Sequence, residues 1–152
     1  MAASVTLMAR DRGGALPSFQ LLIYPVTNYS FDTPSYRQNA SGYMLTRDDM
    51  VWFWRHYLAN KADGLHPYAS PLRAKELQGL PPALVITAEF DPLRDEGEEY
   101  AARLRDARVP VSLRRHTGAI HPFISVLVSD LGRRALAEAV GALRVGLAVS
   151  SR

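Results

Sequence analysis

The sequence predicts an α/β fold with a parallel sheet, and two patterns carry this prediction. Segments of strand length alternate with segments of helical periodicity, in the order helix, strand, insertion, strand, helix, strand, helix. Two of the strand segments, residues 19–26 and 83–90, are nearly continuous apolar runs, as is typical of strands buried on both faces. Strands that alternate with helices are joined by right-handed crossovers into a parallel sheet. The 152 residues suffice for one domain with its own core.

The first elements are a helix and a buried strand. The helix is predicted over residues 2–10 and ends before Gly13 and Gly14. No Ser, Thr, Asp or Asn precedes it as an N-cap, so the sequence is expected to begin inside a helix. The strand covers residues 19–26 (FQLLIYPV) and ends near Pro25.

Residues 27–80 are predicted to form a cap-like insertion within this single truncated domain, which spans residues 1–152. Residues 27–45 are polar and read as a loop, whereas Thr46–Asp49 resembles a capping box that starts a helix. Residues 60–82 are rich in proline and glycine and predict an irregular connection. The apolar side of the predicted helix consists of Met50, Phe53, Trp54, Tyr57 and Leu58. The aromatic residues Trp52, Phe53, Trp54 and Tyr57 fit either ordinary packing or the wall of an apolar substrate pocket.

The second half of the sequence continues the alternation. The second buried strand, residues 83–90, is followed by a helix over residues 95–107 and a shorter alternating strand over residues 109–115. A final helix is predicted over about residues 129–147. The first turn of the 95–107 helix carries negative side chains, which the positive N-terminal end of the helix dipole favours. They are Glu96, Glu98 and Glu99.

Composition and charge exclude several classes of protein. Hydrophobic residues make up 47% and charged residues 22%, which argues against a disordered or collagen-like chain. The net charge of +3 is spread along the chain, so no nucleic-acid partner is expected. There is no cysteine, and His116 and His121 do not share a helical face, so no metal site is expected. Apolar runs are too short for a membrane helix, and without a signal-peptide pattern a cytoplasmic location is expected.

Asp91 and His121 are the candidate catalytic residues. Asp91 directly follows the second buried strand, and His121 lies in the loop after the next strand. Carboxyl ends of neighbouring parallel strands converge on one edge of the sheet, where open α/β folds bind their ligands. An Asp that accepts a hydrogen bond from one imidazole nitrogen leaves the other nitrogen free to act as a base. From position alone, a turn-forming Asp and an unrelated loop His remain alternatives.

The longer motifs resemble one enzyme family. The stretches LLIYPVTNYSFDTPSY, GYMLTRDDMVWFWRHYL, HPYASPL, LPPALVITAEFDPLRDEGEEYAARLRDARVPVSLRR and IHPF are similar to the C-terminal half of the hormone-sensitive-lipase-like (family IV) α/β-hydrolase carboxylesterases. The resemblance implies an α/β-hydrolase fold in which Asp91 is the triad acid and His121 the triad base. It also implies hydrolysis of short- to medium-chain carboxylic esters without a cofactor. Residues 27–80 then contribute a cap helix and an acyl-pocket wall.

Three departures from the family pattern qualify this expectation. No serine has a Gly-x-Ser-x-Gly context, the His-Gly-Gly-Gly oxyanion segment is absent, and Pro122 follows His121 where the family has Gly. The isolated chain is therefore expected to be weakly active or inactive as an esterase. The alternative is a catalytically silent fragment that self-associates or serves as an interaction module. Exposed edges of the partial sheet, at residues 19–26 and 109–115, predict a homodimer or larger homo-oligomer.

Overall fold

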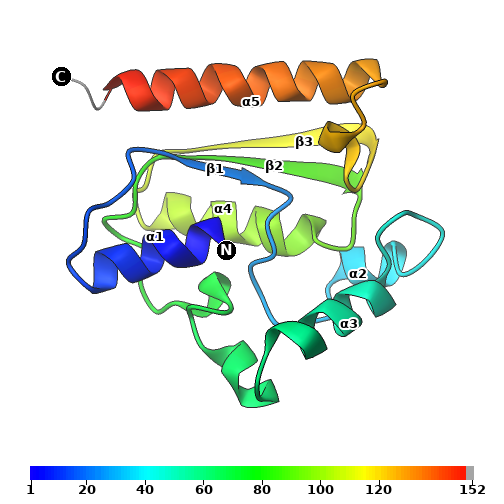
Figure 1. The fold of residues 1–152 in the computed structure, drawn as a ribbon, viewed down its shortest axis with the longest axis horizontal. Coiled ribbons are helices and arrows are strands. Elements are labelled where there is room, and N and C mark those ends of the chain that lie inside the picture. The colour runs from blue at the N-terminus through cyan, green and yellow to red at the C-terminus, as the bar shows by residue number, and fades with distance from the viewer. Residues whose placement is uncertain (150–152) are drawn as a thin grey trace.

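A three-stranded parallel sheet lies at the centre of the computed structural model, which describes residues 1–149 (Figure 1). The strand order is β1 (Gln20–Ile23), β2 (Ala83–Phe90) and β3 (Val111–Ile120). Helices α1 (Ala2–Asp11) and α4 (Arg94–Asp106) lie on one face, and α5 (Asp130–Val149) lies on the other. The predicted fold class is confirmed, because the strands are parallel and alternate with helices.

The central strand β2 is buried on both faces, which explains its continuous apolar sequence. Ala83 and Val85 point into a core shared with α1 and α4, which includes Leu7, Tyr100 and Leu104. The alternate residues Leu84, Ile86 and Ala88 point into a second core beneath α5, which includes Ala135 and Ala139. Successive residues of a strand face opposite sides of the sheet, so apolar residues occupy consecutive positions from Ala83 to Ile86.

The bounds of the outer strands differ from those predicted. β1 covers only Gln20–Ile23, because Tyr24 adopts a positive φ of 33° and Pro25 then follows. β3 begins after Pro110 and continues to Ile120, so that it includes the polar stretch beyond residue 115. β3 is an edge strand with many exposed side chains, so its polar residues keep their contact with water and lose little free energy of hydration. The register between β2 and β3 shifts at Ala88–Phe90, and β3 ends immediately before His121.

The segment between β1 and β2 holds two α-helices and two 3₁₀ turns. The predicted helix α3 covers Arg47–Tyr57 and begins with the expected capping box between Thr46 and Asp49. The polar stretch before it contains a helix that the sequence analysis missed, α2 (Pro34–Gln38), which Thr33 caps. The 3₁₀ turns η1 (Lys61–Leu65) and η2 (Pro71–Arg73) make up part of the irregular connection.

Each predicted helix of the second half is present within one or two residues of its expected bounds. α4 buries Tyr100, Ala101 and Leu104, as its periodicity predicts. On α5 the buried positions are Gly132, Ala135 and Ala139, whereas Leu136 and Val140 of the predicted stripe are exposed. None of the helices in residues 1–149 combines the length and apolarity that crossing a membrane requires.

Candidate active site

Asp91 is completely buried at the carboxyl end of β2, and each of its carboxylate oxygens has one partner. Oδ1 accepts a hydrogen bond from the Leu93 backbone N–H at 2.8 Å. Oδ2 lies 2.8 Å from Nδ1 of His121. Asp91 therefore holds the turn that follows β2 and binds an imidazole at the same time, so its place in a turn does not exclude a role in the site.

His121 lies at the carboxyl end of β3, between the strand and the 3₁₀ turn η3 (Phe123–Ser125). Because a carboxylate only accepts hydrogen bonds, Nδ1 is the donor to Asp91, and in the neutral ring the Nε2 lone pair is free. The side chain is 19% exposed, compared with 1% for Asp91. No hydrogen bond to Nε2 occurs within residues 1–149, and Pro122 does not prevent the predicted contact.

Side chains from the cap-like segment fix the turn that follows Asp91. The Ser35 hydroxyl donates a hydrogen bond to the Pro92 carbonyl at 2.7 Å, and the Ser35 N–H donates to the Asp95 carboxylate at 2.7 Å. The Asn39 amide donates to the Asp91 carbonyl at 3.3 Å. Helix α2, which sequence periodicity did not reveal, thus ties the cap-like segment to the backbone of the candidate acid.

Glu96 is a second buried carboxyl group near Asp91. Its Oε1 accepts hydrogen bonds from the backbone N–H groups of Thr27 at 2.6 Å and Asn28 at 3.1 Å, which join β1 to the cap-like segment. Burial and, to a smaller extent, the negative charge of Asp91 raise the pKa of Glu96, the two N–H donors oppose them, and the resulting pKa is about 8. Glu96 is therefore mostly neutral at neutral pH.

The sequence analysis placed Glu96 in the first turn of this helix, where it lies, but it did not foresee that the side chain is buried. The signal that could have placed it correctly is helical periodicity, since Glu96 lies three residues after Leu93 and four before Tyr100. Both of these neighbours are buried, so Glu96 shares their face of α4.

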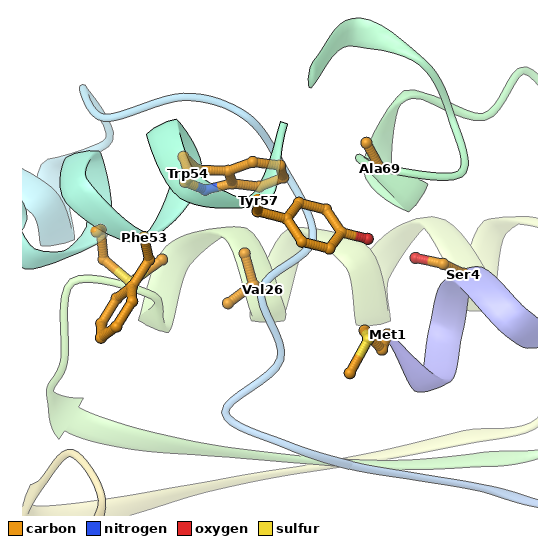
Figure 2. A pocket seen from close by; sticks show the side chains of 8 residues that line it. Met1, Ser4, Val26, Phe53, Trp54, Tyr57 and Ala69 are labelled. Carbon is orange, nitrogen blue, oxygen red and sulfur yellow. The ribbon is translucent and has the colours of Figure 1, made fainter. Parts of the chain in front are cut away.

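An apolar pocket of about 290 Å³ opens between α1 and α3, as Figure 2 shows. Phe53, Trp54 and Tyr57 reach it from α3, whereas Met1 and Ser4 reach it from α1. Trp54 is buried, but Phe53 and Tyr57 remain more than half exposed. The remaining lining residues are Val26, Met50 and Ala69. Three of the four aromatic residues therefore line a pocket, and Trp52 instead lies against His56 with ring centroids 4.0 Å apart.

The geometry of an Asp–His pair at the carboxyl edge of a parallel sheet agrees with the sequence comparisons. Residues 1–125 match a family described as having the alpha/beta hydrolase fold. The chain belongs to this α/β-hydrolase fold family. A carboxylic ester hydrolase of Mycobacterium tuberculosis, LipN, is 40% identical over 153 residues, covering 97% of this chain and 41% of that protein. The predicted resemblance to hormone-sensitive-lipase-like esterases is thereby confirmed.

Solved esterase structures share the same arrangement of this α/β-hydrolase region. A thermostable esterase from Pseudomonas putida superposes with a TM-score of 0.86 at 47% identity, over 91% of this chain and 45% of that one. EstE1, a thermophilic carboxylesterase cloned from a metagenomic library, gives 0.91 at 42% identity, over 96% and 51%. The chain thus spans about half the length of the proteins that it resembles.

Asp91 and His121, the two residues that the sequence analysis selected, come together, and the other three histidines lie elsewhere. His56 and His66 are exposed. His116 lies 3.6 Å from the Glu138 carboxylate on the side of the sheet covered by α5. Within residues 1–149 no group of three or more His, Cys, Asp or Glu side chains is arranged to hold a metal ion.

Proposed function

We propose that this chain contributes the acid and the base of a serine carboxylesterase site that acts on short- to medium-chain carboxylic esters. The observation that carries the proposal is the hydrogen bond between the buried Asp91 carboxylate and Nδ1 of His121 at 2.8 Å. Asp91 holds the imidazole in one tautomer and stabilises the imidazolium, while Nε2 removes the proton from the attacking hydroxyl group. The apolar pocket between α1 and α3 suits the hydrocarbon part of an ester.

The nucleophile of this proposed site comes from a polypeptide segment other than these 152 residues. None of the serines stands in the Gly-x-Ser-x-Gly context that presents a nucleophile on a sharp strand-to-helix turn. A base without a hydroxyl to activate leaves little catalysis, and we expect the isolated chain to hydrolyse p-nitrophenyl butanoate no faster than its His121→Ala variant.

Complementation tests the proposal directly. The chain is refolded together with the part of the P. putida esterase that it does not match, and the excised matching part of that esterase serves as the positive control. The mixture is expected to hydrolyse p-nitrophenyl butanoate, and His121→Ala or Asp91→Asn should each lower its kcat by about 10³-fold or more. His56→Ala, at an exposed histidine away from Asp91, is the matched control and should leave the rate unchanged.

Two results would contradict the proposal. One is a mixture whose activity does not depend on His121, because the base would then lie elsewhere. The other is an inactive mixture under conditions in which the esterase's own excised part restores activity.

The free edge of β1 favours a second candidate role, self-association. β1 pairs only with β2 among the described strands, so the backbone groups on its outer side lack a neighbouring strand. Apolar edge strands are templates for pairing with another chain. We therefore propose a homodimer or larger assembly through β1 or, at the opposite edge, β3. Light scattering on dilute protein should give a mass above 16.9 kDa, and a monodisperse monomer would refute this role.

A further inference from the structure

Tyr24 lies directly beside His121, and nothing in the sequence pattern marks it as part of the site. The centroids of the two rings are 4.5 Å apart, with their planes at 55°. The Tyr24 ring also meets Phe123 edge-on, with centroids 6.0 Å apart. The phenol ring therefore contacts both the candidate base and the first residue of η3.

The backbone at Tyr24 holds a conformation that directs this ring. Its φ of +33° is one that residues with a Cβ rarely adopt. The Tyr24 N–H still donates a hydrogen bond to the Ile86 carbonyl at 2.7 Å, so the residue remains attached to the end of the sheet. Such a conformation persists only where the surroundings hold it, and it is commonly found at functional sites.

The hydroxyl end of Tyr24 faces η3. Burial raises the pKa of the Tyr24 phenol, hydrogen bonding by Ser125 and Ile124 opposes the rise, and the negative charge of Asp91 adds to it. One side chain thus faces the 3₁₀ turn through its hydroxyl, the base through its ring and the sheet through its own backbone.

The hydrogen bond to Asp91 fixes only one atom of the imidazole. About that bond the ring can still tilt, and the side chain is partly exposed, so water can compete for Nδ1. A flat aromatic surface at 4.5 Å restricts the tilt and covers one side of the hydrogen bond. Contacts of this kind change an equilibrium constant by roughly two- to tenfold.

We propose that Tyr24 is a positioning residue for His121. Its ring packs against the imidazole and its hydroxyl faces the 3₁₀ turn that follows, so that Nδ1 stays on Asp91 and Nε2 keeps one direction. The significance of this role rests on the proposed function, but the positioning itself is a property of the isolated chain and is measurable without any activity.

The test is the exchange of the Nδ1 proton of His121 with water, observed by proton NMR at low temperature. The resonance is assigned by its loss in His121→Gln. Tyr24→Leu removes the ring while keeping a residue with the same backbone restriction, and we expect it to shorten the exchange lifetime by about tenfold. Tyr24→Phe keeps the ring and loses the hydroxyl, and we expect a decrease of about threefold.

Tyr29→Leu is the matched control. Tyr29 is also a half-buried tyrosine whose ring meets two aromatic rings, those of Phe31 and Trp54, but it does not contact His121. Its loss should lower the melting temperature while leaving the lifetime of the Nδ1 proton nearly unchanged. A melting curve for each variant separates general loosening of the fold from loss of positioning.

An unchanged lifetime in folded Tyr24→Leu would overturn the proposal. If that variant does not fold, Tyr24→Phe decides, and an unchanged lifetime there would overturn it equally. An equal decrease in Tyr29→Leu would also refute it, because the effect would then follow stability alone. Absence of the resonance in the wild-type chain would refute the proposal at its basis, the Asp91–His121 bond. If complementation fails but the Tyr24 variants shorten the lifetime of the Nδ1 proton as expected, only the proposed function is contradicted.

Discussion

Glu96 and Asp91 are the two acidic side chains that are completely buried within residues 1–149, and Glu96 offers a test of the electrostatics around the site. The substitution is Glu96→Gln, which keeps the shape of the side chain and the oxygen that accepts from Thr27 and Asn28. Gln has no ionisable proton, so the variant isolates the effect of charge from the effect of packing.

The sign and size of the effect follow from the pKa of Glu96, which burial raises from 4.5 to about 8 in the folded chain. Between these values the folded state holds a proton that the unfolded state has released, so the free energy of unfolding falls as the pH rises. The contribution is fully present below the unfolded value and is lost as the pH rises through the folded value. Each pH unit within this interval corresponds to about 1.4 kcal/mol. From about pH 6 to pH 8 the wild type should therefore lose roughly 2 kcal/mol that Glu96→Gln does not lose.

Urea denaturation followed by circular dichroism, at about pH 6 and pH 8, measures this difference. The groups that face Glu96 and could titrate with it are Tyr36 and Asp91, and both remain in the variant, as do all the histidines. Glu99→Gln, at an exposed position on the same helix, is the matched control and should retain the wild-type pH dependence. If Glu96→Gln and the wild type lose the same stability between the two pH values, Glu96 is not the buried acid that the structure indicates.

Two further predictions concern the helices. Thr46→Ala removes the hydroxyl that accepts the Asp49 N–H at 3.1 Å, and it should lower the free energy of unfolding by about 1 kcal/mol in urea melts, whereas no change would mean that α3 does not depend on its capping box. A Cβ at Gly132 would lie 2.6 Å from the Phe123 carbonyl oxygen, so Gly132→Ala should cost about 1–3 kcal/mol. On the same helix, nothing lies within 4 Å of a Cβ at Gly141, so Gly141→Ala should stabilise the chain by about 0.5–1 kcal/mol. Thermal melts that rank these two variants in the opposite order would contradict the packing of η3 against α5.

Local patterns explain why much of the fold is predictable from the sequence. The nearly continuous apolar run of β2 reflects burial on both faces of a sheet, and such a run can be recognised from the local sequence alone. The Thr46–Asp49 capping box is likewise a local arrangement of hydrogen bonds, and it appears where expected. Asp91 was found because it directly follows a predicted strand and His121 because it lies in the loop after the next one, and parallel strands bring such positions together.

Other features depend on contacts between distant segments, and the sequence by itself does not determine them. Helix α2 has too few residues for a periodic pattern. Its Ser35 is hydrogen-bonded to Pro92 and Asp95, which lie 57 and 60 residues later in the sequence, after β2. β3 extends through polar residues because pairing with β2, rather than its own composition, holds it in the sheet.

The sequence by itself determined the order of helices and strands, the α/β class, the family resemblance and the two residues that meet at the sheet edge. These depend on residue spacing and on short-range preferences, which are present in the chain before it folds. Only the tertiary structure decided that Glu96 lies against Thr27 and Asn28 and that Tyr24 stands against His121. Burial and ring contact are properties of which segments come together, and the free energy of a carboxyl group or an imidazole is set by those neighbours.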